Sequence, residues 1–347
     1  MDIKQESAET LRNKCPACYR QYNKFEHLLD HMKSSYHSVH EPTCGICKKH
    51  CRSYESLREH LIGPLPKMEC ARIFSSRGCN LCLNIFNSFE ELQRHRERCR
   101  IPRASAPDLL VGGGGRTRGQ AIAMGCKMVG GGNDGSLDIC ARVCIIDEDE
   151  NIIYHSYVKP IIPVTNYRYD MTGIRAENLK DAAPWKQVQK RIQEILYNGE
   201  SIWKARSKGG RARILVGHGL NHDLDCLGID YPAHLMRDTA KYPPLMKTSK
   251  LSNSLKYLTQ AYLGYEIQVG IQDPYEDCVA AMRLYKRMRS QAHRIEEFRA
   301  PYDSHTVNQL TTMKPRDLEK MTPDAMLEIS RSDYYCWCLD RVQLPEP

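Results

Sequence analysis

Three cysteine pairs of the form Cys-x2-Cys stand within the first hundred residues, and a histidine follows each pair after twelve further residues. Two cysteines on a tight hairpin and a histidine on the helix that follows place soft ligands around a tetrahedral zinc ion. A segment this short folds around its metal rather than around a large apolar core. We therefore expect residues 1–100 to form three small ββα zinc fingers, at about 13–40, 42–72 and 77–100.

Ligand spacing is regular in the first and third fingers, and each also has an aromatic residue and a leucine where such a finger needs its small core. Thiolate binds zinc as well as imidazole does, so a cysteine in the last position is acceptable. The expected ligands are Cys15, Cys18, His31 and His37 in the first finger, with His40 as an alternative to His37, and Cys79, Cys82, His95 and Cys99 in the third.

The second finger is irregular. Cys44, Cys47 and His60 have the regular spacing, but residues 63–66 (Gly-Pro-Leu-Pro) fill the usual window for the fourth ligand and offer no ligating side chain. Cys70, after a longer loop, is the best remaining candidate. A degenerate finger without zinc is the alternative. The sequence therefore predicts two or three structural Zn²⁺ sites.

The connections between the fingers constrain what they bind. Fingers that read successive base triplets need short, regular linkers, and those here are irregular. RNA shape recognition, non-specific nucleic-acid contact and protein contact all stay open, with nucleic acid favoured over protein. The arginines around the end of the third finger suit phosphate contact, although they also fit a solvated helix end. They are Arg94, Arg96, Arg98 and Arg100.

Charge and composition agree with this interpretation. The formal net charge is +8, and residues 1–120 hold 20 Lys and Arg against 13 Asp and Glu, so nearly all of the excess lies with the fingers and the linker. Such a field favours polyanions. The 16 cysteines, without a signal peptide or an apolar run long enough to span a bilayer, favour metal ligands in a reducing compartment and no membrane partner.

Beyond the fingers, composition predicts three further stretches. Residues 101–118 contain Pro, Ser and four consecutive Gly, which is typical of a flexible linker. Residues 119–290 alternate strand-like and helix-like patterns, which predicts an α/β domain that starts with three antiparallel strands. Residues 291–347 form a polar tail with one predicted helix at about 315–331 and an aromatic, cysteine-containing end.

An ordered series of motifs runs through residues 119–290: MVG, YVKP, TGI, LVGHGLNHDL, RDT and YEDCVAAMRLY. In order and spacing this series resembles the RNA exonuclease 4 group of the DEDDh 3′–5′ exonucleases, especially the plant members that carry zinc fingers. The resemblance implies a ribonuclease-H-like fold, with a mixed central sheet and flanking helices. It also implies RNA as the partner and a nuclear location, with the cytoplasm as the alternative.

The chemistry of that family uses four carboxylates that hold two divalent metals, and a histidine that deprotonates the attacking water. By resemblance, Asp223 matches the acid of the second motif and Asp277 matches the last acid. The Asp-x-Glu of the first motif is replaced by Gly125 and Lys127, and the histidine by Gln272. An ammonium about 4 Å from a divalent ion costs roughly 8 kcal/mol at an effective dielectric of 20. Two-metal cleavage is therefore expected to fail.

We hypothesise that the Lys127 ammonium replaces the metals by neutralising Asp223 and Asp277. The alternative is that Lys127 turns to solvent. The leading functional interpretation is a nucleic-acid-binding protein, for RNA above all, with an inactive exonuclease domain. The alternatives are an active 3′–5′ exoribonuclease that uses Mg²⁺ or Mn²⁺, with Glu276 or Asp225 as substitute ligands, and a protein-interaction scaffold.

Overall fold

A computed structural model describes residues 13, 15, 20–35, 41–99, 121–205, 210–248, 250–291, 320 and 334–341. The chain divides into two compact units. The first, which we call the finger unit, contains Met1–Cys99 with Pro243–Leu251 and Met288–Pro347; the second, which we call the sheet unit, contains Arg100–Tyr242 and Ser252–Arg287. Within the described residues, no helix combines the length and apolar character that a bilayer span requires.

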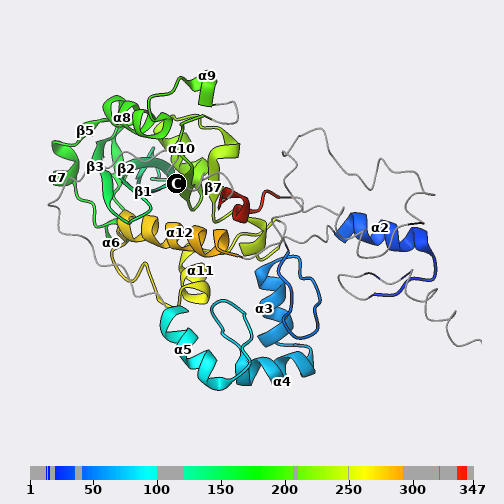
Figure 1. The fold of residues 1–347 in the computed structure, drawn as a ribbon. Helices are drawn as coiled ribbons and strands as arrows, with labels where there is room; N and C mark the ends of the chain where they lie inside the picture. The colour runs from blue at the N-terminus through cyan, green and yellow to red at the C-terminus, as the bar shows by residue number, and fades with distance from the viewer. Residues whose placement is uncertain are drawn as a thin grey trace, which may run out of the picture. The chain divides into compact units, whose positions relative to one another are not determined.

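In the sheet unit, the described strands form one seven-stranded mixed sheet in the order β5-β3-β2-β1-β6-β7, and β4 pairs with β1 (Figure 1). The pairs β1–β2 and β2–β3 are antiparallel, as expected from the sequence, and β1–β6 and β6–β7 are parallel. The strands are β1 (Ile122–Gly131), β2 (Leu137–Ile146), β3 (Ile152–Lys159), β4 (Val164–Asn166), β5 (Ala183–Pro184), β6 (Leu215–Gly217) and β7 (Met236–Asp238).

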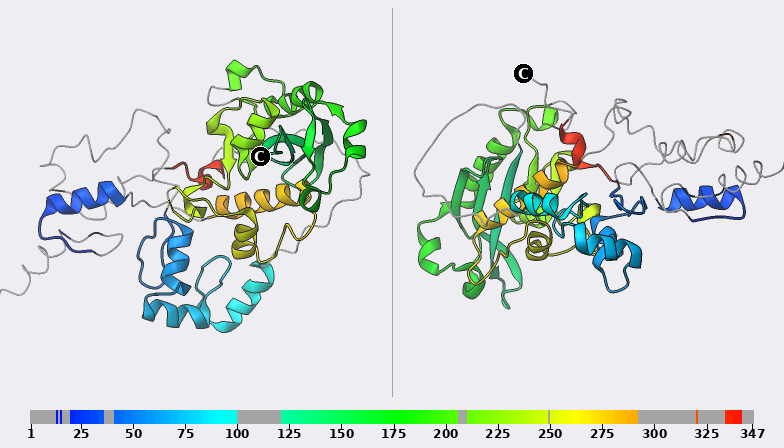
Figure 2. Two further views of the ribbon diagram at one scale, coloured as in Figure 1. Left: turned by 180° about the vertical axis from the view of Figure 1, so that it is seen from behind. Right: turned by 60° about the horizontal axis from the view of Figure 1, so that its bottom comes forward.

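Helices cover both faces of this sheet (Figure 2), which is why β1 is buried along both of its sides. The helices described in the sheet unit are α6 (Tyr169–Thr172), α7 (Ala176–Lys180), α8 (Trp185–Tyr197), α9 (Ile202–Ala205), α10 (Leu220–Leu227), α11 (Leu255–Tyr262) and α12 (Pro274–Arg289), with the 3-10 turn η1 (Ala233–Leu235). The 3-10 turns η2 (Pro243–Leu245) and η4 (Trp337–Arg341) belong to the finger unit.

Side-chain alternation along β1 assigns each face. Ile122 and Met124 pack into the core cluster formed with the apolar sides of α8 and α10. Gly125 lies against the first turn of α12, because a Cβ built there would be 2.9 Å from the carbonyl oxygen of Pro274. Side chains alternate between the two faces of a strand, so Lys127, two residues after Gly125, also faces α12. The predicted α/β class and ribonuclease-H-like arrangement are confirmed.

The finger unit contains four described helices: α2 (Phe25–Ser35), α3 (Tyr54–Ile62), α4 (Met68–Arg77) and α5 (Phe89–Cys99). Isolated antiparallel bridges, Thr43 with His50 and Gly78 with Ile85, form the hairpins that precede α3 and α5. The second and third fingers contact each other directly, since Arg58 donates from Nη1 to the carbonyl of Asn80 at 3.0 Å. The two fingers are therefore packed against each other and are not separate modules joined by a linker.

Segments far along the chain complete the finger unit. Cys336, Trp337 and Cys338 are buried, and the hydroxyl of Tyr335 donates to Asp340 at 3.1 Å. Burial raises the pKa of Tyr54, at the start of α3, and the thiols of Cys336 and Cys338 add to the effect, so this segment lies near α3. The predicted tail helix at about 315–331 lies almost wholly outside the described residues.

Candidate functional site

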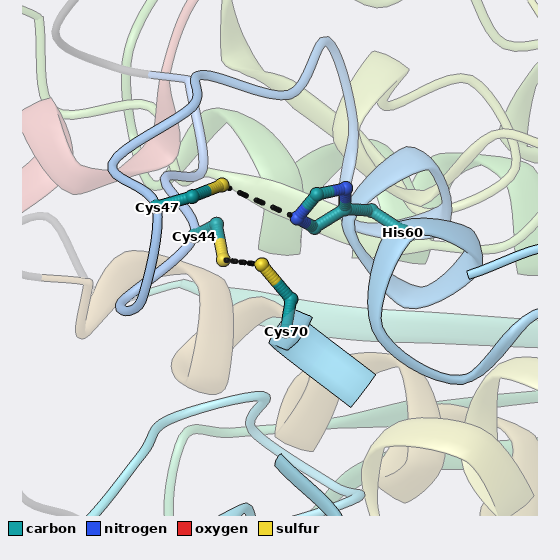
Figure 3. Close-up of side chains that lie close together, drawn as sticks. All are labelled: Cys44, Cys47, His60 and Cys70. Carbon is teal, nitrogen blue, oxygen red and sulfur yellow. Dashed lines mark hydrogen bonds between the residues drawn. The ribbon is translucent and has the colours of Figure 1, made fainter. Parts of the chain in front are cut away.

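The four expected ligands of the second finger converge on one point (Figure 3). The Sγ atoms of Cys44 and Cys70 are 4.0 Å apart, Cys47 Sγ is 3.4 Å from His60 Nε2, and all four ligand atoms lie within 4.8 Å of one another. Tetrahedral zinc with Zn–S bonds of about 2.3 Å needs sulfur atoms about 3.8 Å apart. The donor set and its spacing therefore fit zinc.

Helix α4 is what brings Cys70 to this cluster. The chain leaves α3 through Gly63, whose N–H donates to the carbonyl of Glu59 at 3.1 Å, and folds back where the Lys67 N–H donates to His60 at 3.1 Å. Cys70 then follows in the first turn of α4 and is fully buried. Residues 63–66 act as the bend that lets a remote thiol replace the missing fourth ligand.

The third finger has the same geometry with regular spacing. Cys79 Sγ lies 3.8 Å from Cys99 Sγ, and Cys82 Sγ lies 3.2 Å from His95 Nε2. The ring of Phe86 stacks on His95 with centroids 4.4 Å apart, which fixes the imidazole toward the metal position. These ligand atoms also lie within 4.8 Å of one another and fit zinc.

The first finger is described only in part. Cys15 and Leu28 are buried, and the ring of Tyr22 lies 5.0 Å from that of His31, as in the third finger. Three residues of its expected ligand set lie outside the described residues: Cys18, His37 and the alternative His40.

The arginines proposed to contact nucleic acid lie on α5. Arg94, Arg96 and Arg98 are exposed, while Arg100 lies outside the described residues. The same helix carries three glutamates, Glu90, Glu91 and Glu97, so α5 alone has no net positive charge. Any preference of this helix for phosphate therefore depends on whether its arginines and its glutamates lie on different faces of the helix.

In the sheet unit, the residues that the sequence resemblance assigns to the catalytic positions come together. The Lys127 ammonium donates to Asp277 Oδ2 at 2.5 Å and to Gln272 Oε1 at 3.0 Å. The Lys127 and Asp277 side chains are 8% and 14% exposed. The alternative in which Lys127 turns to solvent is therefore wrong. A cation of the protein itself occupies the position beside Asp277.

The second oxygen of Asp277 is also engaged. Gln268 donates from Nε2 to Asp277 Oδ1 at 2.9 Å, and its own N–H donates to Glu276 at 2.9 Å. Sequence reasoning missed Gln268, which lies in a turn at φ 57° with no motif around it. Both oxygens of the last family acid are thus held by donors from this chain, and Glu276 is engaged as well.

Asp223 faces the same site from α10. Burial raises the pKa of its carboxyl to about 7; the nearby charges of Asp277 and Asp238 raise it further, and Lys127 opposes them. An ordinary aspartate ionises near 3.8. Burial therefore favours the protonated form of Asp223, whereas a divalent metal requires the ionised carboxylate.

Gly125 removes a possible carboxylate from the site and also allows α12 to pack closely against β1. A Cβ at this position would lie 2.9 Å from the backbone oxygen of Pro274 and 3.2 Å from the thiol of Cys278. The absence of a side chain lets the first turn of α12 approach β1 closely. An aspartate at 125 would not fit unless α12 moved.

The remaining polar residues of the LVGHGLNHDL and RDT motifs serve structure. Asp238 accepts from the N–H groups of Gly219 and Leu220 at 2.8 and 3.1 Å, and so caps the start of α10. Burial lowers the pKa of His218, whose Nδ1 pairs with the Thr239 hydroxyl at 3.0 Å. His222 contacts Asp138 at 2.8 Å, and Asp225 is exposed on α10.

Comparison with known proteins agrees with this geometry. Residues 128–285 match the family model described as Exonuclease. RNA exonuclease 4 of Homo sapiens is 38% identical over 189 residues, which are 54% of this chain and 41% of that protein. RNA exonuclease 4 of Xenopus laevis is 41% identical over 167 residues, which are 48% of this chain and 36% of that protein. The matched region therefore spans about two fifths of the length of these relatives.

Among solved structures, the pseudoubiquitin hydrolase–RNA exonuclease module of Saccharomyces cerevisiae Pan2 aligns with a TM-score of 0.41 and 24% identity. The alignment covers 50% of this chain and 29% of the Pan2 chain.

Replacement of Cys70 tests the second metal site. We expect Cys70→Ser to lower the zinc content of the purified chain by about one equivalent, because a serine hydroxyl is a poor zinc ligand. Elemental analysis of the protein after gel filtration measures this. Cys51→Ser is the matched control, since burial raises the pKa of the Cys51 thiol to about 12 and it lies outside the ligand cluster. Equal zinc content in both variants would contradict the assignment.

The raised pKa of Asp223 predicts a pH dependence of stability. Between about pH 4 and pH 7 the folded state holds a proton that the unfolded state has released, so stability falls as the pH rises through this window. We expect Asp223→Asn to raise the melting temperature by a few degrees at pH 8 and by much less at pH 5. Asp225→Asn, exposed on the same helix, should change neither value. A lower melting temperature of Asp223→Asn at pH 8 would refute this account.

The ion pair itself is tested by Lys127→Met, which keeps the length of the side chain and removes its charge. Removal of one partner of a buried pair leaves an uncompensated charge, so we expect the free energy of unfolding to fall by about 3 kcal/mol in denaturant titrations. Lys186→Met, at an exposed position on α8, should change it by less than about 0.5 kcal/mol. Equal effects of the two substitutions would contradict the buried pair.

Proposed function

We propose that residues 128–285, which match the Exonuclease family model, have kept RNA recognition while losing two-metal phosphodiester cleavage. The single observation that carries the proposal is the contact between the Lys127 ammonium and Asp277. The relatives named RNA exonuclease 4 support RNA as the partner. The same resemblance supports a nuclear location.

The donor set of the exonuclease site does not fit a pair of divalent metals. Lys127 contacts the carboxylate oxygen that a metal would need, and Gln268 holds the other one. To bind there, a metal must displace an ammonium that compensates a buried carboxylate, and it must remain near that ammonium afterwards. At an effective dielectric of 20 this repulsion amounts to roughly 8 kcal/mol at about 4 Å.

The group that would activate water is also missing. Gln272 accepts a hydrogen bond from Lys127 through Oε1 and donates its backbone N–H to Met171 at 2.7 Å. A glutamine amide can orient a water but cannot take its proton at neutral pH. His218 is buried against Thr239, and burial lowers its pKa. Among the described residues around Asp277, neither a metal-binding set of carboxylates nor a histidine base stands at the matching positions, which supports loss of cleavage.

The zinc fingers supply the other part of the proposed function. The clusters of the second and third fingers fit structural Zn²⁺, which organises small modules that have little apolar core. Because these two fingers pack on each other, they present one fixed surface rather than a flexible series. Such a surface suits recognition of RNA shape better than sequential reading of base triplets.

A nuclease assay tests the proposal directly. The full chain is incubated with a 5′-labelled single-stranded RNA and manganese, and the products are separated on a denaturing gel. We expect the RNA to stay full-length while a native gel at physiological salt shows its retardation. We also expect millimolar Mg²⁺ to leave the melting temperature of the chain unchanged.

Two outcomes contradict the proposal in different ways. Stepwise shortening of the RNA that Asp277→Ala abolishes would show an active 3′–5′ exoribonuclease with unusual ligands. Failure to retard any RNA at physiological salt would instead favour a protein-interaction scaffold. Asp230→Ala, at an exposed position beyond α10, is the matched control for the first outcome and should leave the products unchanged.

A further inference from the structure

The second finger contains an open pocket beside its zinc ligands, which we call the finger pocket. Its volume is about 640 Å³, within the range of about 300–1,000 Å³ that is usual for ligand pockets. Its walls come from the hairpin with Cys47 and Lys49, from helix α3 with Glu59 and His60, and from the bend at residues 64–67. All of these residues belong to the finger unit, so the pocket is formed within one unit.

The finger pocket exists because the second finger has no fourth ligand at the usual place. In the third finger, α5 continues to Cys99, so the helix itself carries the last ligand. In the second finger, α3 ends earlier, and the chain bends through residues 63–66 before α4 delivers Cys70. Cys70 is fully buried, whereas Cys47 and His60 line the pocket (Figure 3). The bend therefore leaves one side of the ligand cluster open.

The bend also gives the pocket an apolar wall. Pro64, Leu65 and Pro66 line it, and Leu65 is 95% exposed, the highest value among the described large apolar side chains. Ile62 and Met68, on either side of the bend, are exposed as well. Scattered exposed apolar residues are ordinary, but several in one short segment indicate a binding surface. Because the prolines restrict the backbone, little conformational entropy is lost when a ligand covers Leu65.

Charged side chains stand on the other walls of the pocket. Lys49 lines it from the hairpin, Lys67 from the end of the bend and Glu59 from α3. The Glu59 carboxylate lies over the bend, since a Cβ built on Gly63 would collide with its Oε2. Glu69, on α4 beyond Lys67, lines a separate hollow. The finger pocket thus combines one carboxylate with two ammonium groups.

The charge of the pocket is nearly balanced once the metal is counted. Zinc bound by three thiolates and a neutral imidazole has a net charge of about −1. Together with Glu59, this charge offsets Lys49 and Lys67. A ligand attracted by positive charge alone is therefore disfavoured. A neutral polar ring with an apolar face and anionic flanks fits better, and an unstacked nucleobase in an RNA strand has this character.

We propose that the finger pocket binds one unstacked guanine base of single-stranded RNA. The base lies against the apolar wall, its N1–H and N2–H groups donate to the Glu59 carboxylate, and its flanking phosphates contact Lys49 and Lys67. Proteins that recognise RNA sequence usually read the edges of such splayed-out bases. The inference rests on the proposed function, because it assigns RNA recognition by the fingers to one surface.

The carboxylate is what selects guanine among the bases. An ionised carboxylate has two acceptor oxygens and no donor. Guanine presents two adjacent donors, so both oxygens of Glu59 are used in one paired contact. Cytosine and adenine present an amino group beside a ring acceptor, and uracil presents one N–H between two carbonyls. Each of these bases therefore places an acceptor opposite a carboxylate oxygen, which weakens the contact.

Binding of matched oligonucleotides tests this inference. The full chain is titrated against a fluorescently labelled short oligouridine with one central guanosine, and fluorescence anisotropy measures the affinity. Inosine in place of the guanosine lacks only the N2 amino group. We expect this change to weaken binding about tenfold, because one hydrogen bond to a charged group is lost. Uridine at the same position should weaken binding further.

Variants of the chain identify the residues that make the contact. Glu59→Ala should bind the three oligonucleotides equally, whereas Glu69→Ala, exposed on α4, should keep the preference for guanosine. Elemental analysis checks that both variants keep their zinc. Lys49→Ala and Lys67→Ala should each reduce the slope of log affinity against log salt by about 0.7 without changing the preference. Lys190→Ala, exposed on α8, should change neither quantity.

The outcomes separate this inference from the proposed function. If the full chain binds all three oligonucleotides equally, the inference is wrong while the proposed function stands. If it binds no RNA, both are wrong. The inference also fails if Glu59→Ala, with its zinc retained, still prefers guanosine. Protection of Lys49 and Lys67 from acetylation by a polyglutamate peptide, but not by the guanosine oligonucleotide, would assign the pocket to a protein partner and overturn the inference.

Discussion

The ion pair between Lys127 and Asp277 is the constraint around which the polar site between β1 and α12 is arranged. A carboxylate that is largely removed from water must be neutralised, hydrogen-bonded or protonated. Lys127 supplies the positive charge, and Gln272 and Gln268 supply an acceptor and a donor that complete the network. Asp223, for which the described part of the chain supplies no partner at hydrogen-bonding distance, follows the third route, and its pKa rises to about 7. Asp277 and Asp223 are thus accommodated in two different ways, by an ion pair and by a raised pKa.

Much of this site was predictable from the sequence. The motif order indicates which strands neighbour one another, and β1 beside β6 brings Lys127 toward Asp223 at the start of α10. Asp277 reaches Lys127 from α12, whose first turn packs against β1. Charge then requires that the lysine pair with a carboxylate. Gln268 could not be predicted, because it lies in an aperiodic turn whose path depends on the packing of α12. The close packing of α12 against Gly125 could not be predicted either, because a glycine in a sequence does not show which part of the backbone will pack against it.

In the finger unit, too, some features could be predicted from the sequence and others could not. Cys70 could be assigned by elimination, because residues 63–66 offer no ligand and zinc requires a fourth. The helix that carries it, α4, and the packing of the second finger on the third were not evident from the ligand spacing. Nor does the sequence show that Cys336, Trp337 and Cys338 are buried near α3. Local spacing specifies a metal site, whereas contacts between distant segments depend on the whole unit.

The pairing of Lys127 with Asp277 also bears on how the proposed RNA binding would work. In a two-metal site the divalent ions attract the scissile phosphate as well as activate it. Here the Lys127 ammonium already compensates Asp277, so it has little charge left for a phosphate. Under the proposed function, affinity for RNA comes from groups outside this site, through arginine and lysine contacts with phosphates. Such contacts weaken steeply with salt, whereas a buried ion pair is screened much less. Raising the ionic strength should therefore weaken the proposed RNA binding while it leaves the Lys127–Asp277 ion pair, and with it the stability of the fold, largely unchanged.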